Sequence, residues 1–221
     1  MSKKLTLEQI QEKYKNFAFN NKHDKGITFF KKIIKNKKLA RIDRIQLDLA
    51  FLLYHQAFKF YNKKETTRIK QKSAEKQINE AIKILNKIVY SKRKNIGEKD
   101  MLNARIYLAQ IYAVTKNKKA IELAKETFKK EPSSTTANRL ANVYIILENV
   151  KLAEFWYKKY EKLSNKENSP KYHTFLDMAV FYRRIGKDKL AEKYLKKILK
   201  ILPKNNTEKS ILNTIKNNFN L

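Results

Sequence analysis

Apolar side chains recur three and four positions apart along most of the chain, which is the spacing of one face of an α-helix. The pattern is most regular between residues 101 and 203, where amphipathic segments of helical length follow one another in pairs. Each pair predicts two helices joined by a short turn. The pattern of the whole chain predicts an all-α protein.

Three segments within this region share one order of residue types. Each has an apolar residue followed by a small one, a tyrosine three positions later, and then a second alanine. The residues are Leu108, Ala109, Tyr112 and Ala120; Leu140, Ala141, Tyr144 and Ala153; and Met178, Ala179, Tyr182 and Ala191. Small side chains let two helix backbones approach closely, and the nearby tyrosine fills the remaining space. Pro132 and Pro203 end the second helix of their units, because proline cannot continue the helical hydrogen-bond ladder.

These segments resemble the tetratricopeptide repeat, whose pattern has a small-residue pair, tyrosine, alanine, a large apolar residue and proline in the same order. The resemblance covers residues 101–203 as three repeats. The tryptophan of the family's first helix is absent; Ala104 stands there in the first unit and Phe175 in the last. Asn165 replaces the terminal proline of the middle unit. The resemblance implies a right-handed α-solenoid of helix–turn–helix repeats, each burying its apolar face against the next.

Residues 1–100 fit the repeat less well. Leu49–Leu53 and Ala81–Ile88 resemble the two helices of a unit, but the longer segment between them also keeps helical spacing. We therefore expect degenerate helical pairs that include a long antiparallel helical hairpin over residues 41–93, with its tip near residues 62–67.

The last segment of the chain, residues 204–221, predicts one more helix. It would carry Ile211, Leu212, Ile215 and Phe219, with Thr207 as its N-cap. We expect this C-terminal capping helix to cover the exposed end of the solenoid.

Composition agrees with a helical fold. The 221 residues include 3 Gly and 3 Pro, too few for the tight turns of a β-sandwich or an α/β fold. Because cysteine is absent, disulfides, thiolate nucleophiles and cysteine-ligated metals are excluded. No stretch has the length and apolar character of a signal peptide or a transmembrane segment, so we expect a cytoplasmic protein.

The chain is strongly basic, with 51 Lys and Arg against 21 Asp and Glu and a formal net charge of +30. Abundant Lys, Asn and Ile are also what an AT-rich genome encodes without selection for binding, so the charge has two explanations. Whatever its origin, it attracts acidic proteins, nucleic acid or anionic lipid. Lys far outnumbers Arg, which counts against base-specific readout, because Lys lacks the bidentate fork of Arg.

Motifs for catalysis are not found in the sequence. His23, His55 and His173 do not have metal-ligand spacing, and neither a glycine-rich phosphate loop nor a nucleophile elbow occurs. We therefore expect a protein that is not an enzyme and that has no metal and no cofactor.

Two surfaces are candidate binding sites, and for each the alternative is an ordinary solvated surface. The resemblance implies that the first helix of each repeat lines a concave groove, whose side chains not used for packing are Gln110, Asn138, Arg139, Asn142, Asp177, Arg183 and Arg184. The family's carboxylate clamp is not reproduced, and Asp177 would repel a carboxylate. The second candidate is an anion-binding hairpin tip with Lys59, Lys63, Lys64, Arg68 and Lys70.

The aromatic residues give a weaker signal. Stacking on aromatic side chains is one way to bind single-stranded nucleic acid, but Tyr112 and Tyr144 occupy repeat positions that predict burial. The run of Phe155, Trp156 and Tyr157 is different, because one member of it must point partly outward.

The sequence as a whole predicts a non-enzymatic adaptor or scaffold of the tetratricopeptide type. It would bind an acidic partner protein or peptide within a larger assembly. The alternative is an RNA- or ribosome-associated basic helical-repeat protein. In the adaptor, binding to nucleic acid would be mainly non-specific and caused by charge.

Overall fold

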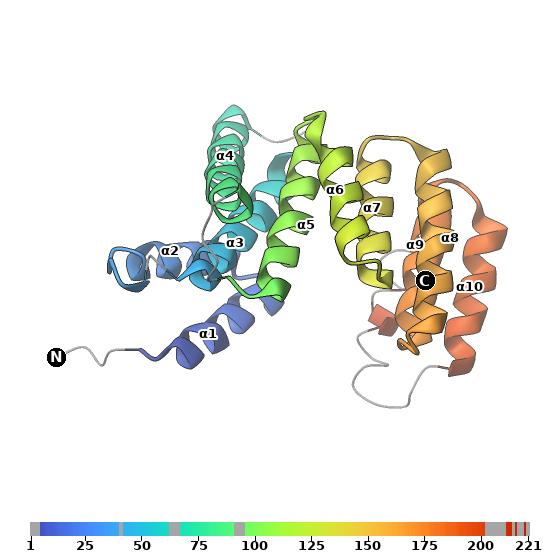
Figure 1. Cartoon of the computed structure of the whole chain (residues 1–221). Helices are drawn as coiled ribbons and strands as arrows, with labels where there is room; N and C mark the ends of the chain where they lie inside the picture. Colours follow the sequence, from blue (N-terminus) through green and yellow to red (C-terminus); the bar gives the residue numbers. More distant parts are fainter. Residues whose placement is uncertain are drawn as a thin grey trace. The chain divides into compact units, whose positions relative to one another are not determined.

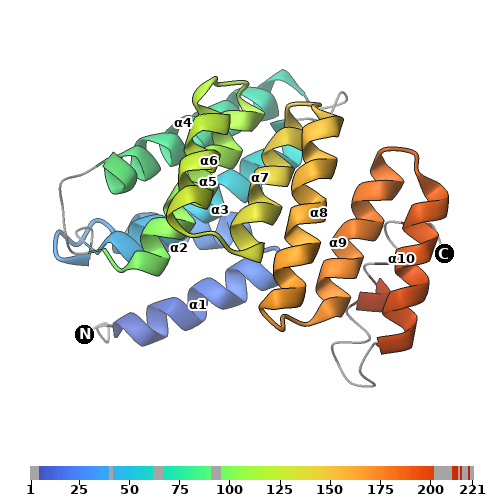
Figure 2. The same ribbon diagram turned by 45° about the vertical axis from the view of Figure 1, so that its right-hand side comes forward.

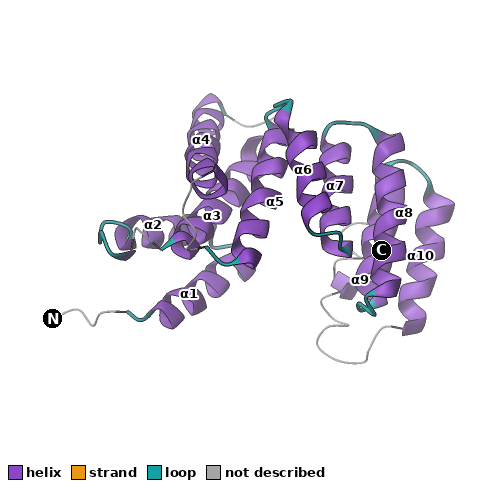
Figure 3. Ribbon diagram, viewed as in Figure 1, coloured by secondary structure: helices purple, strands orange, loops and turns teal. Residues whose placement is uncertain are grey.

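The computed structural model describes residues 5–39, 42–61, 67–90, 96–201, 211–213, 215 and 219. All the secondary-structure elements in these ranges are helices, and no described residue belongs to a β-strand (Figure 3). The prediction of an all-α protein is confirmed. The chain divides into two compact units, residues 1–120 and 121–221, and the helices of each unit pack mainly against their neighbours in sequence.

The first unit is built around a long helical pair (Figure 1). Its helices are α1 (Leu7–Phe19), α2 (His23–Ile33), α3 (Asp43–Tyr61), α4 (Arg68–Tyr90) and α5 (Glu98–Val114). α3 packs along α4, α2 packs on α3, and α5 packs on α4. α3 and α4 lie within the predicted hairpin range, 41–93, and residues 62–66 at its predicted tip lie outside the described residues.

Local sequence sets the ends of these helices. α1 begins with a capping box, in which the Thr6 hydroxyl accepts from the Gln9 backbone N–H and the Gln9 side chain accepts from the Thr6 N–H. α1 and α5 are each followed by a residue in the left-handed region, Asn21 and Lys116, both with φ of 54°. This conformation stops a helix by turning the chain back onto its last carbonyls.

Gly26 allows a close approach of three helices. A Cβ atom built at this position of α2 would lie 2.9 Å from Leu52 Cδ1 of α3 and 3.0 Å from Phe17 Cβ of α1. Such contacts are too short for an unshifted side chain. The missing Cβ therefore lets α1 and α3 pack closely on this position, although it lies inside a helix, where glycine is usually unfavourable.

The second unit contains two helical pairs (Figure 2). Most of α6 (Lys119–Lys130) belongs to it, followed by α7 (Ser134–Ile146), α8 (Val150–Lys166), α9 (Lys171–Arg184) and α10 (Asp188–Ile201). α7 packs along α8, α9 packs along α10, and α8 joins the two pairs by packing against α9. Glu148, Asn168 and Gly186, with φ of 59°, 51° and 73°, end α7, α8 and α9.

The small residues and tyrosines of the repeat pattern are core residues. The six alanines at the shared positions are between 0% and 2% exposed, namely Ala109, Ala120, Ala141, Ala153, Ala179 and Ala191. Tyr112, Tyr144 and Tyr182 are 5%, 2% and 3% exposed. Their predicted burial is confirmed.

The last described residues pack on the second unit. Residues 211–213, 215 and 219 are helical, and Ile211 and Ile215 are buried in a cluster with Ile198 of α10. Phe175 of α9 packs against the same cluster. Residues 204–210, including the predicted N-cap Thr207, lie outside the described residues.

None of the described helices combines the length and the apolar character that a membrane crossing requires.

Candidate binding groove

A groove of about 550 Å³ lies in the second unit and takes its lining from α7, α8, α9 and the α8–α9 turn. The lining residues are mostly polar: Ser134, Thr135, Asn138, Arg139, Asn142, Tyr157, Tyr160, Ser164, Ser169, Pro170, His173, Thr174, Leu176, Asp177 and Val180. Asn138 and Asn142 are one helical turn apart on α7, and His173 and Asp177 are one turn apart on α9. The helical spacing therefore directs each pair to the same side of its helix.

A continuous chain of hydrogen bonds crosses the groove wall. The Tyr157 hydroxyl donates to Asn142 Oδ1 at 2.9 Å, and Asn142 Nδ2 donates to Asn138 Oδ1 at 2.6 Å. Asn138 Nδ2 then donates to Asp177 Oδ2 at 2.7 Å, and the Tyr160 hydroxyl donates to the same oxygen at 2.9 Å. The chain links three helices and fixes the orientation of both side-chain amides.

Asp177 is the central acceptor of this network. Burial raises its pKa, while the hydrogen bonds from Tyr160 and Asn138 and the nearby charge of Arg139 oppose that rise. Burial, followed by the charge of Asp177, raises the pKa of Tyr160 to about 12 and also raises that of Tyr157. Both phenols therefore stay protonated donors at neutral pH.

Two further contacts hold the three helices around the groove. The backbone N–H and the hydroxyl of Ser134, at the start of α7, donate to the Glu167 carboxylate at the end of α8, at 2.7 Å and 2.5 Å. The hydroxyls of Ser164 on α8 and Thr174 on α9 lie 2.5 Å apart. These contacts fix the groove before any ligand arrives, which reduces the entropy lost on binding.

The structure brings together four of the seven predicted groove residues: Asn138, Arg139, Asn142 and Asp177. Arg183 and Arg184, in the last turn of α9, are outside the lining, and Arg183 Nη1 lies 2.8 Å from Asp188 Oδ1. Gln110 is on α5 of the first unit.

The predicted hairpin-tip residues have different environments. Lys59 Nζ donates to the backbone carbonyl of Asn21 at 3.5 Å, so this side chain is directed to the α1–α2 turn. Arg68 is exposed at the start of α4, and Lys70 Nζ lies 5.8 Å from the centre of the Phe60 ring. Lys63 and Lys64 lie outside the described residues.

The sequence pattern did not identify the tyrosines of α8 as groove residues. Tyr157 and Tyr160 have core spacing and are indeed 6% and 7% exposed. Their rings are buried, and their hydroxyls bond to Asn142 and Asp177 in the groove wall. A tyrosine at a position that phenylalanine could fill was the signal for this role, because a buried phenol needs a hydrogen-bond partner.

The first unit holds a separate buried ion cluster. Asp48 of α3 is 2% exposed, and its Oδ1 accepts from Arg44 Nε at 3.0 Å. Arg44 Nη1 also donates to Asp100 Oδ1 of α5 at 2.7 Å, which ties α3 to α5. Asp48 Oδ2 is buried and has no hydrogen-bond partner among the described residues. Burial, opposed by the charge of Arg44, raises the pKa of Asp48 to about 7.

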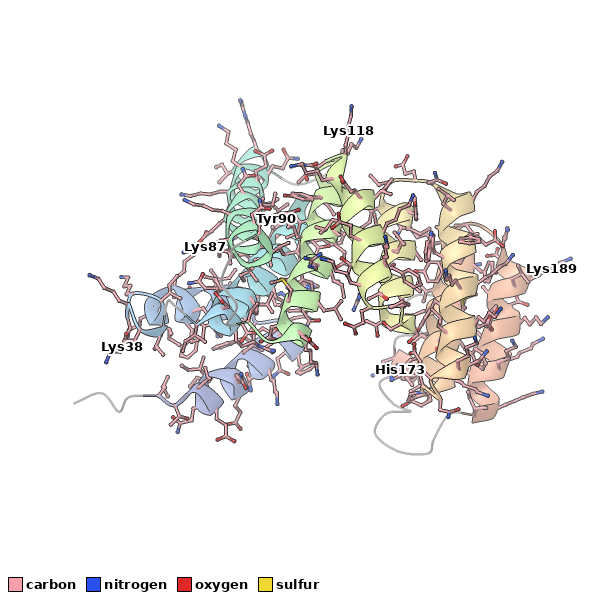
Figure 4. All side chains as sticks on the ribbon, in the orientation of Figure 1. Lys38, Lys87, Tyr90, Lys118, His173 and Lys189 are labelled. Atoms are coloured by element: carbon pink, nitrogen blue, oxygen red, sulfur yellow. The ribbon has the colours of Figure 1, made fainter. Side chains whose placement is uncertain are left out.

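Two of the three histidines meet in the first unit. The rings of His23 and His55 lie 5.8 Å apart between centroids, and burial followed by the charge of Lys59 lowers the pKa of His23. His173 is at the start of α9 in the second unit (Figure 4). Nowhere in the described ranges do three or more His, Asp or Glu side chains form a group able to hold a metal ion.

No protein family model matches the chain, and a comparison with curated proteins gives no match. The groove and the distribution of charge are thus the basis for assigning a function.

Proposed function

We propose that this protein is a non-enzymatic adaptor in which tetratricopeptide-like repeats form a right-handed solenoid. Its groove between α7, α8 and α9 binds an extended acidic segment of a partner protein, within a larger assembly. The observation that carries the proposal is the ordered row of amides and hydroxyls on the groove wall, with the exposed Arg139 beside it.

The size and polarity of the groove suit a peptide. Its volume of about 550 Å³ falls within the range of roughly 300–1,000 Å³ that is usual for ligand sites. An extended peptide exposes backbone N–H and C=O groups, which side-chain amides and hydroxyls can satisfy. Asn138 and Asn142, held in place by Asp177 and Tyr157, provide such groups on α7.

The charge around the groove favours an acidic segment. Arg139 is exposed at the groove, and its charge also acts on the Asp177 carboxylate. Asp177 is compensated by the Asn138 and Tyr160 donors, which weakens the repulsion expected of it. The net charge of +30 steers acidic partners toward the protein.

The contacts of the groove hydroxyls support a binding role rather than a catalytic one. The Ser134 hydroxyl donates to Glu167, and the Ser164 hydroxyl is paired with Thr174. Neither hydroxyl is bonded to His173, the histidine that lines the groove. Neither of these two serines therefore forms the pairing of nucleophile and base that activates a serine.

A charge reversal within the groove tests the proposal. Arg139→Glu is compared with Lys189→Glu, an exposed side chain that extends from α10 (Figure 4). Both variants change the net charge by the same amount. With a fluorescent Asp- and Glu-rich peptide as the probe, Arg139→Glu should weaken binding about tenfold or more, because like charges now meet in the groove. Lys189→Glu should weaken it little, and both variants should keep the thermal midpoint of the wild type.

A second measurement uses natural partners. The whole chain serves as bait before and after nuclease treatment, in wild-type and Arg139→Glu forms. We expect protein partners that survive nuclease and are lost in the variant. The proposal of a groove-bound protein partner would be contradicted if Arg139→Glu and Lys189→Glu weakened peptide binding equally. It would also be contradicted if all partners were lost after nuclease treatment.

A further inference from the structure

The side of α8 that faces away from the groove has a distinct chemistry. Ala153, Tyr157 and Tyr160 turn their side chains into the unit and are buried. At 3.6 residues per turn, Phe155 falls on nearly the opposite side of the helix from Tyr157, and it is 57% exposed. Lys151, Lys158 and Lys159 are three or four positions from Phe155 and neighbour it on the helix surface. Lys162 lies two turns away on the same side.

Phe155 is the outermost ring of an ordered aromatic cluster. Its centroid lies 5.6 Å from that of Trp156 at an interplanar angle of 89°, and Trp156 lies 4.9 Å from Phe128 of α6. Lys159 Nζ is 4.6 Å from the centre of the Phe128 ring and 4.8 Å from that of Trp156. Phe128 and Lys159 thus hold Trp156 in place, and Trp156 in turn supports Phe155.

The cations of this face are mostly unneutralised. Lys158 Nζ lies 3.2 Å from Glu154 Oε1. Within the part of the chain that the structure describes, Lys151, Lys162 and Lys166 form no ion pair with an acidic side chain. Lys151 and Lys162 are separated by about 16 Å along the helix axis, at 1.5 Å per residue. Phe155 lies between them.

We propose that this face of α8 binds single-stranded nucleic acid, with a base stacked on Phe155 and backbone phosphates paired with Lys151 and Lys162. Every base has a π-face, so stacking on an exposed ring tolerates any sequence, and lysines supply the charge that follows the backbone. In a duplex the faces of the bases are covered by stacking, so a duplex would gain only the attraction between its phosphates and the lysines. An acidic peptide would likewise use the lysines and leave Phe155 without a function. The inference goes beyond the proposed adaptor function and involves another face of the protein.

The experiment uses a labelled oligouridylate and the whole chain at physiological salt, with fluorescence anisotropy as the readout of affinity. Phe155→Ala leaves the net charge unchanged, and Phe19→Ala removes a phenylalanine that is 83% exposed on α1. The loss of one stacked base, worth about 1–3 kcal/mol, corresponds to a weakening of about fivefold or more. We expect this weakening for Phe155→Ala and wild-type affinity for Phe19→Ala.

Two further measurements locate the phosphates and the base. Lys151→Ala combined with Lys162→Ala should make the negative slope of log K against log salt shallower by about 1.4, since each single-strand phosphate contact contributes about 0.7. The pair Lys189→Ala and Lys193→Ala on α10 removes the same charge and should leave the slope unchanged. Trp156 is the only tryptophan of the chain, so quenching of the wild-type emission by the oligonucleotide reports binding beside Phe155.

Several outcomes would overturn the proposal. One is equal affinity of Phe155→Ala and Phe19→Ala, and another is a duplex that binds as tightly as the single strand. A polyglutamate peptide that binds in a Phe155-independent way would indicate an acidic protein partner instead. A Trp156 emission shift with phosphatidylserine vesicles, but not with oligonucleotide, would indicate a membrane surface. Arg139→Glu should affect oligonucleotide binding no more than Lys189→Glu, so failure here and failure of the groove proposal can be told apart.

Discussion

The burial of Asp48 predicts that the free energy of unfolding depends on pH. Its carboxylate is 2% exposed, and Arg44 Nε donates to Oδ1, while no residue that the structure describes donates to Oδ2. Burial removes water from the carboxylate and thereby favours the neutral acid, so the pKa of Asp48 rises to about 7 from an ordinary value of 3.8. Asp48→Asn keeps the shape and the acceptor Oδ1, and removes the titration.

The direction in which stability changes with pH follows from the difference in proton binding between the folded and the unfolded state. Between pH 4 and pH 7 the folded protein holds the Asp48 proton more tightly than the unfolded chain, so the free energy of unfolding falls as pH rises through this window. Each pKa unit corresponds to about 1.4 kcal/mol, so a shift of about three units makes the full decline about 4 kcal/mol. Below the ordinary pKa both acid and amide are neutral, and the variant should resemble the wild type. Above pH 7 the variant should be the more stable protein.

Urea unfolding followed by circular dichroism at several pH values measures this difference. Subtracting wild type from variant removes the contributions of all other titrating groups. Glu75→Gln, which removes an exposed carboxylate of α4, controls for the loss of one negative charge. A difference that stays flat with pH would show that the charge of Arg44 offsets desolvation at Asp48, and a difference that turns against the variant as pH rises would show that it outweighs desolvation.

Three other substitutions test the packing, each by urea unfolding. Ala153→Phe and Ala191→Phe should each cost about 1–3 kcal/mol, because both alanines are 0–1% exposed where helices cross; wild-type stability in both would show that these positions are not crossings. Gly26→Ala should be destabilising although alanine is the better helix former, since the new Cβ meets Phe17 Cβ at 3.0 Å. Gly97→Ala adds a Cβ at the N-cap of α5, where no atom of the described residues lies within 4 Å, and so controls for the added methyl group but not for helix propensity.

The sequence was most informative where structure depends on neighbours along the chain. Helical spacing of apolar residues is a local property, and the buried Ala141, Ala153 and Tyr144 follow from it directly. The resemblance to the tetratricopeptide repeat implied a groove lined by the side chains of this helix that are not used for packing, and the structure places Asn138, Arg139 and Asn142 of α7 in the groove lining. This part of the site was predictable because it lies on one helix.

Contacts between distant segments could not be predicted in the same way. The His23–His55 ring pair and the Ser134–Glu167 cap depend on how helices pack, which no local spacing specifies. Asp48 is an intermediate case. It is three residues after Ile45 and four before Leu52, both fully buried, so its position on the core side of α3 was visible in the pattern.

The origin of the positive charge can be argued from where the lysines lie on their helices. Cations in the last turn of a helix complement its dipole. α2, α6 and α10 each end with such residues: Lys31 and Lys32, Lys129 and Lys130, and Lys200. These lysines have a local stabilising role, whatever the genome encodes.

Cations in the first turn of a helix are more informative about the origin of the charge, because they oppose the helix dipole and are not favoured there by local stability. Lys151 is in the first turn of α8, and Arg68 and Lys70 are in that of α4; neither first turn contains an acidic residue. Local stability gives no reason for charge at these positions. Neutralising Lys151 should therefore leave stability unchanged or slightly increase it, whereas neutralising Lys129 or Lys130 should lower it by about 0.3–1 kcal/mol at low salt. A stabilising Lys151→Ala that also weakens oligonucleotide binding would indicate that this charge is kept for binding; if it lowers stability, the charge has a structural role instead.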